Sequence, residues 1–175
     1  MRKLAWLALL GVVLPFTAGA QETPAAEVSV GYSYLRLGGS DGDNQNGGSA
    51  SVAFNVNHWL GIVGDFGGYH STPFGVNLNT YTYLFGPRFS LRSESRATPF
   101  FQTLLGGSRL TANAFGTSGS GNAFAYSVGG GVDVRLSQHV AFRPQAEYLG
   151  MHSNGSTLNC ARVTAAIVFR FGGKK

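Results

Sequence analysis

The sequence holds a single cysteine, Cys160, among its 175 residues. One cysteine excludes an intramolecular disulfide framework, so the stability of the fold must come from other interactions. Charge is also sparse, at 12% of the residues, with a formal net charge of +5. The basic residues are not clustered, and this excludes the strong basic patch that a nucleic-acid partner requires.

Long apolar runs are missing after the first twenty residues. Within those twenty, Arg2 and Lys3 precede an apolar run at 4–16 and the small residues at 17–20, which is the order of a cleaved secretory signal peptide. An uncleaved anchor helix is the alternative, but the run is shorter than the ~20 residues that a spanning helix needs. Cleavage after residue 20 removes two basic residues and lowers the net charge to +3.

Apolar residues at helical spacing are missing as well, whereas period-two alternation recurs along the chain. The clearest stretch is 160–171, in which Arg162 and Arg170 share one face of a strand and Phe169 and Phe171 share the other. Glycine and aromatic residues are abundant instead, with 26 glycines and 13% aromatics. We therefore predict an all-β fold.

Eight alternating segments divide the chain, and we predict strands at 27–37, 49–56, 59–69, 80–91, 99–110, 124–136, 140–149 and 160–171. A lead-in at 21–26 precedes this barrel domain of residues 27–171, and a tail follows at 172–175. Polar loops at 38–48, 70–78, 111–122 and 150–159 alternate with shorter turns, an asymmetry typical of outer-membrane barrels. The pattern predicts an eight-stranded antiparallel up-and-down transmembrane β-barrel, with the two faces of 99–110 left undecided.

Nearly all charges in these strands fall on the face opposite the aromatic residues. Inside a barrel they form a lumen charge network, and its predicted members are Asp65, Arg88, Asp133, Arg135, Arg143, Glu147, Arg162 and Arg170. Counting residues from the turns places Asp133 beside Arg143 and Glu147 beside Arg162, so we predict both as ion pairs. Buried charges persist when they are paired, and eight strands enclose a space that side chains fill. We therefore expect a filled lumen and not an open pore.

The aromatic residues are sorted by height along the strands. Tyrosines fall toward the loop end, while Trp59 and several phenylalanines fall near the opposite rim, as in the girdles at the two faces of a membrane. The predicted girdle residues are Tyr32, Tyr34, Trp59, Tyr69, Tyr81, Tyr83, Phe89, Tyr126, Phe142 and Tyr148. A soluble periplasmic barrel of the lipocalin kind is the alternative, and it would turn the aromatic face inward around a ligand.

Four stretches carry a resemblance to a known family: G-Y-S-Y-L-R at 31–36, L-F-G-P-R-F at 84–89, G-G-G-V-D-V at 129–134 and V-F-R-F-G at 168–172. With the alternation, the chain resembles the small eight-stranded outer-membrane β-barrel proteins, including the OmpA transmembrane domain and OmpX. The resemblance implies a monomer in the cell outer membrane, surrounded by lipid and lipopolysaccharide. It also implies that the outer-membrane assembly machinery reads Ile167, Phe169 and Phe171 as an assembly signal.

Residues that carry chemistry are few and scattered. His58 and His139 fall in short turns and His70 and His152 in loops, without the base and nucleophile arrangement of an enzyme. Histidines on two sides of a membrane cannot form one metal site, and no cofactor is implied. We predict a non-enzymatic protein with a structural or surface-interaction role through its loops. A lipid-modifying outer-membrane enzyme is the alternative within the same fold.

Overall fold

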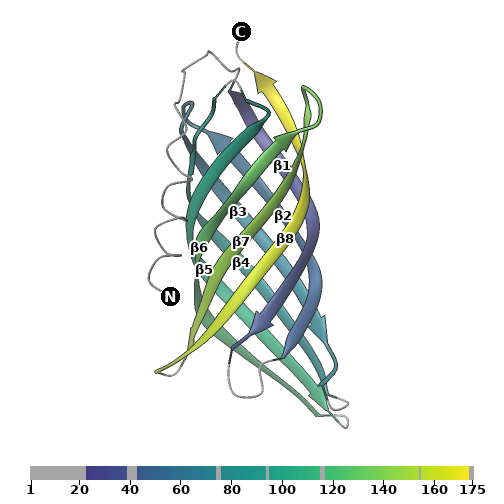
Figure 1. The fold of residues 1–175 in the computed structure, drawn as a ribbon. Helices are drawn as coiled ribbons and strands as arrows, with labels where there is room; N and C mark the ends of the chain where they lie inside the picture. The colour runs from purple at the N-terminus through teal and green to yellow at the C-terminus, as the bar shows by residue number, and fades with distance from the viewer. Residues whose placement is uncertain are drawn as a thin grey trace, which may run out of the picture.

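Eight antiparallel strands close into one barrel in the computed structural model, which describes residues 23–38, 43–73, 76–93, 95–114, 117–153 and 155–173 (Figure 1). The strands are β1 (Pro24–Leu37), β2 (Asn44–Asn55), β3 (Leu60–Ser71), β4 (Asn77–Ser90), β5 (Ala97–Ala114), β6 (Thr117–Arg135), β7 (Val140–Ser153) and β8 (Ser156–Gly173). The expected signal peptide at 1–20 lies outside the described residues. No helix in the described ranges is long and apolar enough to cross a membrane.

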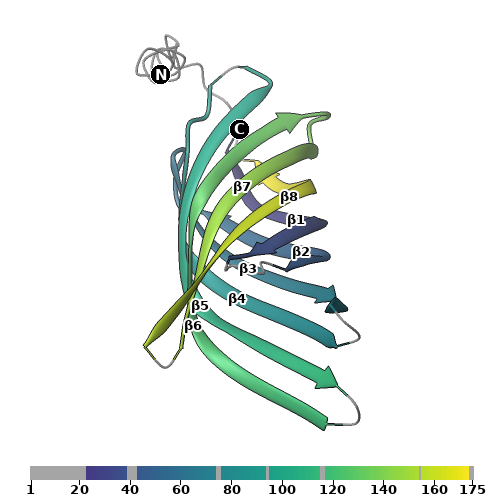
Figure 2. The ribbon, with the colours of Figure 1, turned by 60° about the horizontal axis from the view of Figure 1, so that its bottom comes forward.

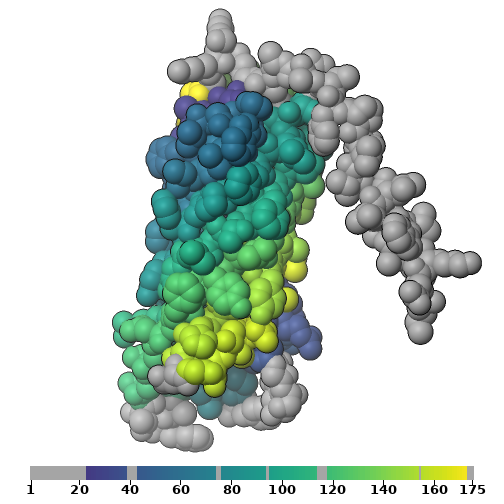
Figure 3. Space-filling model, turned by 90° about the vertical axis from the view of Figure 1, so that its left-hand side faces the viewer, coloured from purple at the N-terminus to yellow at the C-terminus, as the bar shows by residue number. Residues whose placement is uncertain are grey.

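Pairing of the first strand with the last closes the barrel. β1 and β8 run antiparallel from Pro24 opposite Gly173 to Leu37 opposite Cys160. Each strand therefore has a partner on both sides along the body of the barrel, which removes the free edges of an open sheet. The start of β1 and the end of β8 lie at the same end of the barrel, and neighbouring strands run obliquely across the face seen in Figure 3.

The strands are longer than the sequence pattern predicts. β5 and β6 continue until Ala114 faces Thr117, so most of the predicted loop at 111–122 is a two-stranded hairpin. The predicted loops at 38–48, 70–78 and 150–159 are also partly strand, and β1 and β8 extend into the predicted lead-in and tail. These extensions are held by backbone pairing, which does not need the apolar alternation that marks a lipid-facing strand.

β5 is the strand whose faces the sequence leaves undecided. In the structure, Phe100, Gln102 and Leu104 point inward and are buried, while Phe101 and Leu105 are exposed on the outside. On β5, the inward face thus carries both apolar and polar side chains. Figure 2 shows the β5–β6 and β7–β8 hairpins leaving the barrel in different directions at the end opposite the start of β1 and the end of β8.

Candidate functional site

The inward face carries a lumen charge network of Glu27, Asp65, Arg88, Arg92, Asp133, Arg143, Glu147, Arg162 and Arg170. The four acids and three of the arginines, Arg88, Arg143 and Arg162, are each at most 5% exposed. Both ion pairs expected from the sequence form, Asp133 with Arg143 and Glu147 with Arg162. Arg135, also predicted in this set, is half-buried on the same face nearer the termini.

Glu27 is the centre of the half of the network closer to the chain termini. Its Oε2 accepts a hydrogen bond of 2.7 Å from Arg143 Nη2 and lies 3.5 Å from Arg88 Nη1. Its Oε1 accepts a 2.9 Å bond from Arg92 Nη2. Arg143 also binds Asp133 in a bidentate manner, at 2.5 and 2.7 Å. One carboxylate thus joins three strands through three guanidinium groups.

Phe100 of β5 fills the space between two of these arginines. The guanidinium carbons of Arg88 and Arg143 lie 4.6 and 4.9 Å from its ring centroid. A cation over an aromatic face is attracted to the ring, by about 0.5–2 kcal/mol depending on burial. This contact explains why the inner position on β5 belongs to Phe100 although it is apolar.

Arg162 organises the second half of the network, deeper in the barrel. Its Nη1 donates to Asp65 Oδ1 at 2.7 Å and to the Tyr69 hydroxyl at 3.2 Å, while its Nε donates to Glu147 Oε2 at 2.7 Å. Gln102 joins the two halves, since it accepts from Arg88 Nε at 2.9 Å and donates to Glu147 Oε1 at 2.7 Å. The buried charges therefore have partners on strands all around the barrel.

Tyr69 corrects one of the predicted girdle positions. The sequence assigns it to the outer aromatic girdle, but its side chain is 2% exposed and lies in the lumen against Arg162. The alternation on β3 explains the inward position, because Tyr69 shares the parity of Asp65 and Gly67. Gly67 leaves the space that the ring occupies, since an added Cβ there would lie 2.6 Å from the Tyr69 hydroxyl oxygen.

The half of the lumen farther from the termini is largely apolar, although the polar side chains of Gln45, Thr80, Thr82 and Ser108 are also buried there. Its buried apolar side chains form an apolar lumen cluster of Leu35, Leu37, Ala53, Val63, Tyr69, Leu84, Leu104, Ala125, Leu149, Met151 and Cys160. The lumen charge network and the apolar lumen cluster therefore place buried side chains in both halves of the barrel. A lumen filled by these side chains, without a continuous water path, stays a prediction.

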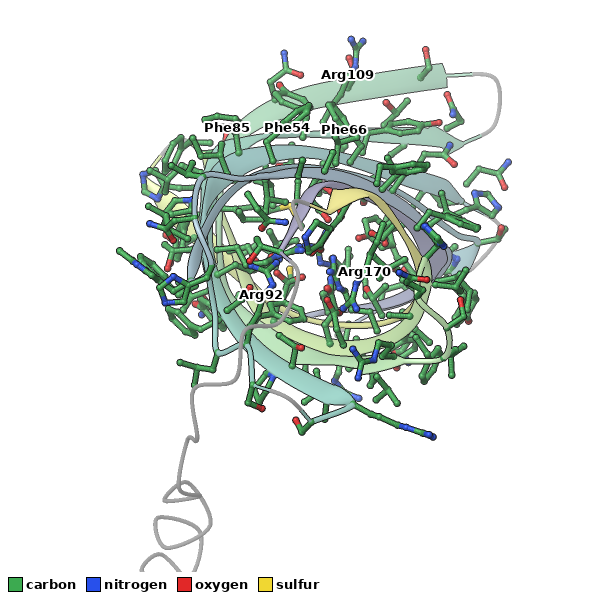
Figure 4. The ribbon with its side chains drawn as sticks, turned by 90° about the horizontal axis from the view of Figure 1, so that it is seen from above. Phe54, Phe66, Phe85, Arg92, Arg109 and Arg170 are labelled. Carbon is green, nitrogen blue, oxygen red and sulfur yellow. The ribbon has the colours of Figure 1, made fainter. Side chains whose placement is uncertain are left out.

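The outer face is apolar where the inner face is charged. Phe54, Phe66 and Phe85 point away from the barrel, while Arg92 and Arg170 lie within it (Figure 4). Each of the three phenylalanines is about 60% exposed. A contiguous apolar surface of this extent requires a cover, and lipid is the cover for a barrel with a charged interior. A soluble ligand-binding barrel would have the reverse arrangement.

The predicted girdle residues other than Tyr69 point outward in the structure. Three of the tyrosines, Tyr32, Tyr34 and Tyr148, donate to Asn46, Asn44 and Asn159 respectively, at 2.5–2.7 Å. At the termini end, the rings of Trp59 and Phe89 stack with centroids 6.0 Å apart. An amphipathic ring with its hydroxyl toward a polar side chain suits the boundary between lipid and water. Their place in a membrane interface stays a prediction.

The β5–β6 hairpin is the longest projection at the end opposite the termini (Figure 1). β5 is paired on one side with β4 as far as Asn113 and on the other with β6. β6 pairs with β7 only from Phe124 onward, so its preceding residues have β5 on one side and no strand on the other within the described ranges. The segment 118–121 is therefore a short free strand edge.

A family model for "Outer membrane protein beta-barrel domain" matches residues 4–171. The chain belongs to this family of outer-membrane barrels. The resemblance to small eight-stranded barrels is thereby confirmed, and membership implies location in the outer membrane. In the family's architecture the short turns face the periplasm, so the end with the chain termini is the periplasmic end and the hairpins are extracellular.

Solved structures of other outer-membrane barrels have the same fold. Neisserial surface protein A has a TM-score of 0.75 at 14% identity, covering 88% of this chain and 100% of that one. Ail of Yersinia pestis has a TM-score of 0.64 at 17% identity, covering 85% and 100%. The barrel domain of Pseudomonas aeruginosa OprF has a TM-score of 0.58 at 13% identity, covering 85% and 100%. A search of curated proteins finds no match.

The histidines of this outer-membrane barrel remain apart from one another. His70 bonds to Asn79 and His152 to Thr157 on the exposed extracellular strands, each at 2.8 Å. His58 and His139 are exposed in turns at the periplasmic end. In the described ranges, no three His, Cys, Asp or Glu side chains come together as a metal site would require. Cys160 is buried in the apolar lumen cluster.

Sequence reasoning missed Glu27 and Arg92, which belong to the network. Both lie at strand ends, where the pattern is shortest. Their parity is the signal that could have found them, because Glu27 shares the inward face of Ser29 and Arg92 continues the inward face of Arg88 beyond the end of β4. The apolar lumen cluster was also missed, because the prediction of inward residues followed the charged residues, which lie in only one half of the inward face.

Proposed function

We propose that this outer-membrane barrel is a non-enzymatic, non-conducting surface protein that pairs the free edge of β6 with an extended segment of a partner protein outside the cell. The single observation that carries the proposal is the β5–β6 hairpin, whose residues 118–121 have a strand on one side only among the described residues. Unpaired backbone N–H and C=O groups on such an edge are a template for an added strand.

A lumen filled with side chains favours a function at the cell surface over transport through the barrel. Arg88, Arg143 and Arg162 are the largest fully buried side chains, and they cross the interior to acids on other strands. A solute would have to break these pairs and then pass the apolar lumen cluster. The extracellular hairpins are the parts of the chain that remain free to meet a large partner.

The length of the hairpin supports the same proposal. A strand needs about 9–11 residues to cross a membrane, whereas β5 has 18 and β6 has 19. The surplus of roughly eight residues a strand carries the hairpin beyond the lipid. Its free edge is built from Ser118, Gly119, Ser120 and Gly121, and a Cβ added at either glycine would meet no atom within 4 Å.

These small residues favour recognition of backbone over recognition of side chains. An edge strand that must be kept from pairing normally carries lysine, proline or a bulge, and 118–121 has none of these. The expected partner is therefore an extended polypeptide segment, bound through main-chain hydrogen bonds with little dependence on its sequence.

A peptide with the sequence of residues 105–113 tests this proposal, because that segment of β5 already pairs with the other side of β6. The labelled peptide is titrated into the barrel in nanodiscs and followed by fluorescence anisotropy. Gly119→Pro and Ser120→Pro each remove one backbone N–H. Since N–H groups alternate in direction along a strand, one of the two substitutions removes a donor from the free edge and leaves the bonds to β5 intact.

We expect saturable binding that this one variant weakens at least fivefold while its barrel remains heat-modifiable on a gel. Arg36→Gln is the matched control, because it changes an exposed side chain at the extracellular end of β1, outside the β5–β6 hairpin. Absence of peptide binding, or equal binding by both proline variants, would contradict the pairing. Turnover of phospholipid that is lost in His152→Ala would contradict the non-enzymatic part.

A further inference from the structure

A cavity of about 570 Å³ opens at the periplasmic end of the barrel. Four arginines line it: Arg92, Arg96, Arg135 and Arg170. They come from the end of β4, the turn that follows it, the end of β6 and the end of β8. His139 of the β6–β7 turn also lines the cavity, and no carboxylate of the described residues does.

Two carboxylates lie deeper in the barrel than the cavity, those of Glu27 and Asp133, and both also bind arginines of the buried network. Glu27 binds Arg92 but also contacts Arg88 and Arg143. Asp133 lies 3.4 Å from Arg170 Nη2 and is held in a bidentate manner by Arg143. In the described network, four acids face five arginines, and Arg96 adds to the positive side at the mouth.

Arg170 shares its acidic partner with a deeper arginine. Its Nη2 lies 3.4 Å from Asp133 Oδ2, the same oxygen that accepts from Arg143 Nη2 at 2.7 Å, and the Arg170 side chain lines the cavity. One carboxylate thus serves two guanidinium groups, which leaves positive charge at the cavity. Figure 4 shows Arg170 and Arg92 within the ring of strands when the barrel is viewed from the periplasmic end.

The cavity also reaches the outer rim of the barrel. Leu136, which directly follows β6, and Phe171, on the outward face of β8, line it and are 62% and 54% exposed. The lining thus passes from arginines inside to apolar side chains at the lipid-facing edge. A ligand with an anionic head and an apolar chain matches both parts.

We propose that the periplasmic mouth binds the phosphate headgroup of an anionic phospholipid from the inner leaflet, with its acyl chains over Leu136 and Phe171. Guanidinium groups bind phosphate oxygens through paired, charge-assisted hydrogen bonds, and several arginines around one cavity suit a phosphodiester. The cavity volume accommodates such a headgroup. The site is separate from the extracellular hairpin and does not depend on its function.

Native mass spectrometry of the purified barrel tests the site, with phosphatidylglycerol, phosphatidylcholine and inorganic phosphate as separate probes. Arg96→Gln is the principal variant, because Arg96 lines the cavity, is exposed and is not a member of the lumen charge network. Arg109→Gln removes an exposed arginine at the extracellular end and is the matched control. Heat-dependent gel mobility establishes that each variant is folded.

We expect one saturable phosphatidylglycerol adduct, weaker binding of phosphatidylcholine, and competition by inorganic phosphate. Loss of one charge-assisted contact weakens binding about tenfold in Arg96→Gln and leaves Arg109→Gln unchanged. Equal affinity of the two variants, or unsaturable adducts, would overturn the site. Binding of inorganic phosphate with no lipid adduct would overturn the lipid assignment, as would capture of an acidic periplasmic peptide in its place.

Discussion

Substitution of Glu27 by glutamine tests the lumen charge network at its most connected point. The carboxylate is 2% exposed and contacts Arg143 at 2.7 Å, Arg92 at 2.9 Å and Arg88 at 3.5 Å. Glutamine has the same size and can still accept one hydrogen bond. It lacks the negative charge, so three acids of the network would then face five arginines.

The partners that each arginine retains set the size of the effect. Arg143 keeps its two bonds to Asp133, and Arg88 keeps Gln102 and the Phe100 ring. Arg92 keeps its hydrogen bond to the carbonyl oxygen of His58, at 3.0 Å. Breaking one buried ion pair costs about 3–5 kcal/mol, and the surviving partners hold the total within that range.

Urea unfolding in lipid vesicles measures this loss. Trp59 is the fluorescent reporter, as the only tryptophan after residue 20. With a slope of about 2 kcal/mol per molar urea, the midpoint falls by about 2 M. Asp43→Asn is the control, because Asp43 accepts a hydrogen bond from Ser71 outside the network and its substitution should cost below about 1 kcal/mol. A loss for Glu27→Gln no larger than that of the control would refute the reasoning.

Three further changes test particular parts of the barrel. Tyr69→Phe removes the hydroxyl that accepts from Arg162 and should lower the free energy of unfolding by about 1 kcal/mol, whereas no loss would place Tyr69 outside the network. Gly67→Val should cost about 1–3 kcal/mol by overpacking, and Gly121→Val, in open space, should cost nothing measurable in the same urea titration. Phe171→Ala should reduce the amount of folded barrel in the outer membrane by western blot if the aromatic end is the assembly signal, and unchanged levels would remove it from that role.

Much of the barrel could be predicted because lipid imposes a strict alternation on each spanning strand. On β8, the exposed Phe169 and the buried Arg162 follow directly from the period of two. The same rule places Asp133 and Arg143 close enough to pair across β6 and β7. On β6, β7 and β8, where the alternation is clearest, sequence and structure agree on which charged side chains face the lumen.

Outside the lipid, a strand does not need the period-two alternation of apolar and polar residues. The differences between prediction and structure lie there. The segment 111–122 reads as a loop because glycine, serine and asparagine show no alternation, although backbone pairing continues through it. Tyr69 was assigned to the girdle from its height along the strand alone. The alternation of side chains on β3 turns it into the lumen instead, where it is buried. The contacts of Phe100 with two arginines depend on the positions of three strands, which no single segment of sequence encodes.

Single-channel recording in planar bilayers tests the central claim most directly, since the assignment of function to the surface rests on a filled lumen. The expectation of a filled lumen comes from the buried Arg88, Arg143 and Arg162 in one half of the barrel and the apolar lumen cluster in the other. We predict that the purified, folded barrel shows no stable conductance step in concentrated potassium chloride. A steady, reproducible step would contradict the filled lumen and would return the function to transport.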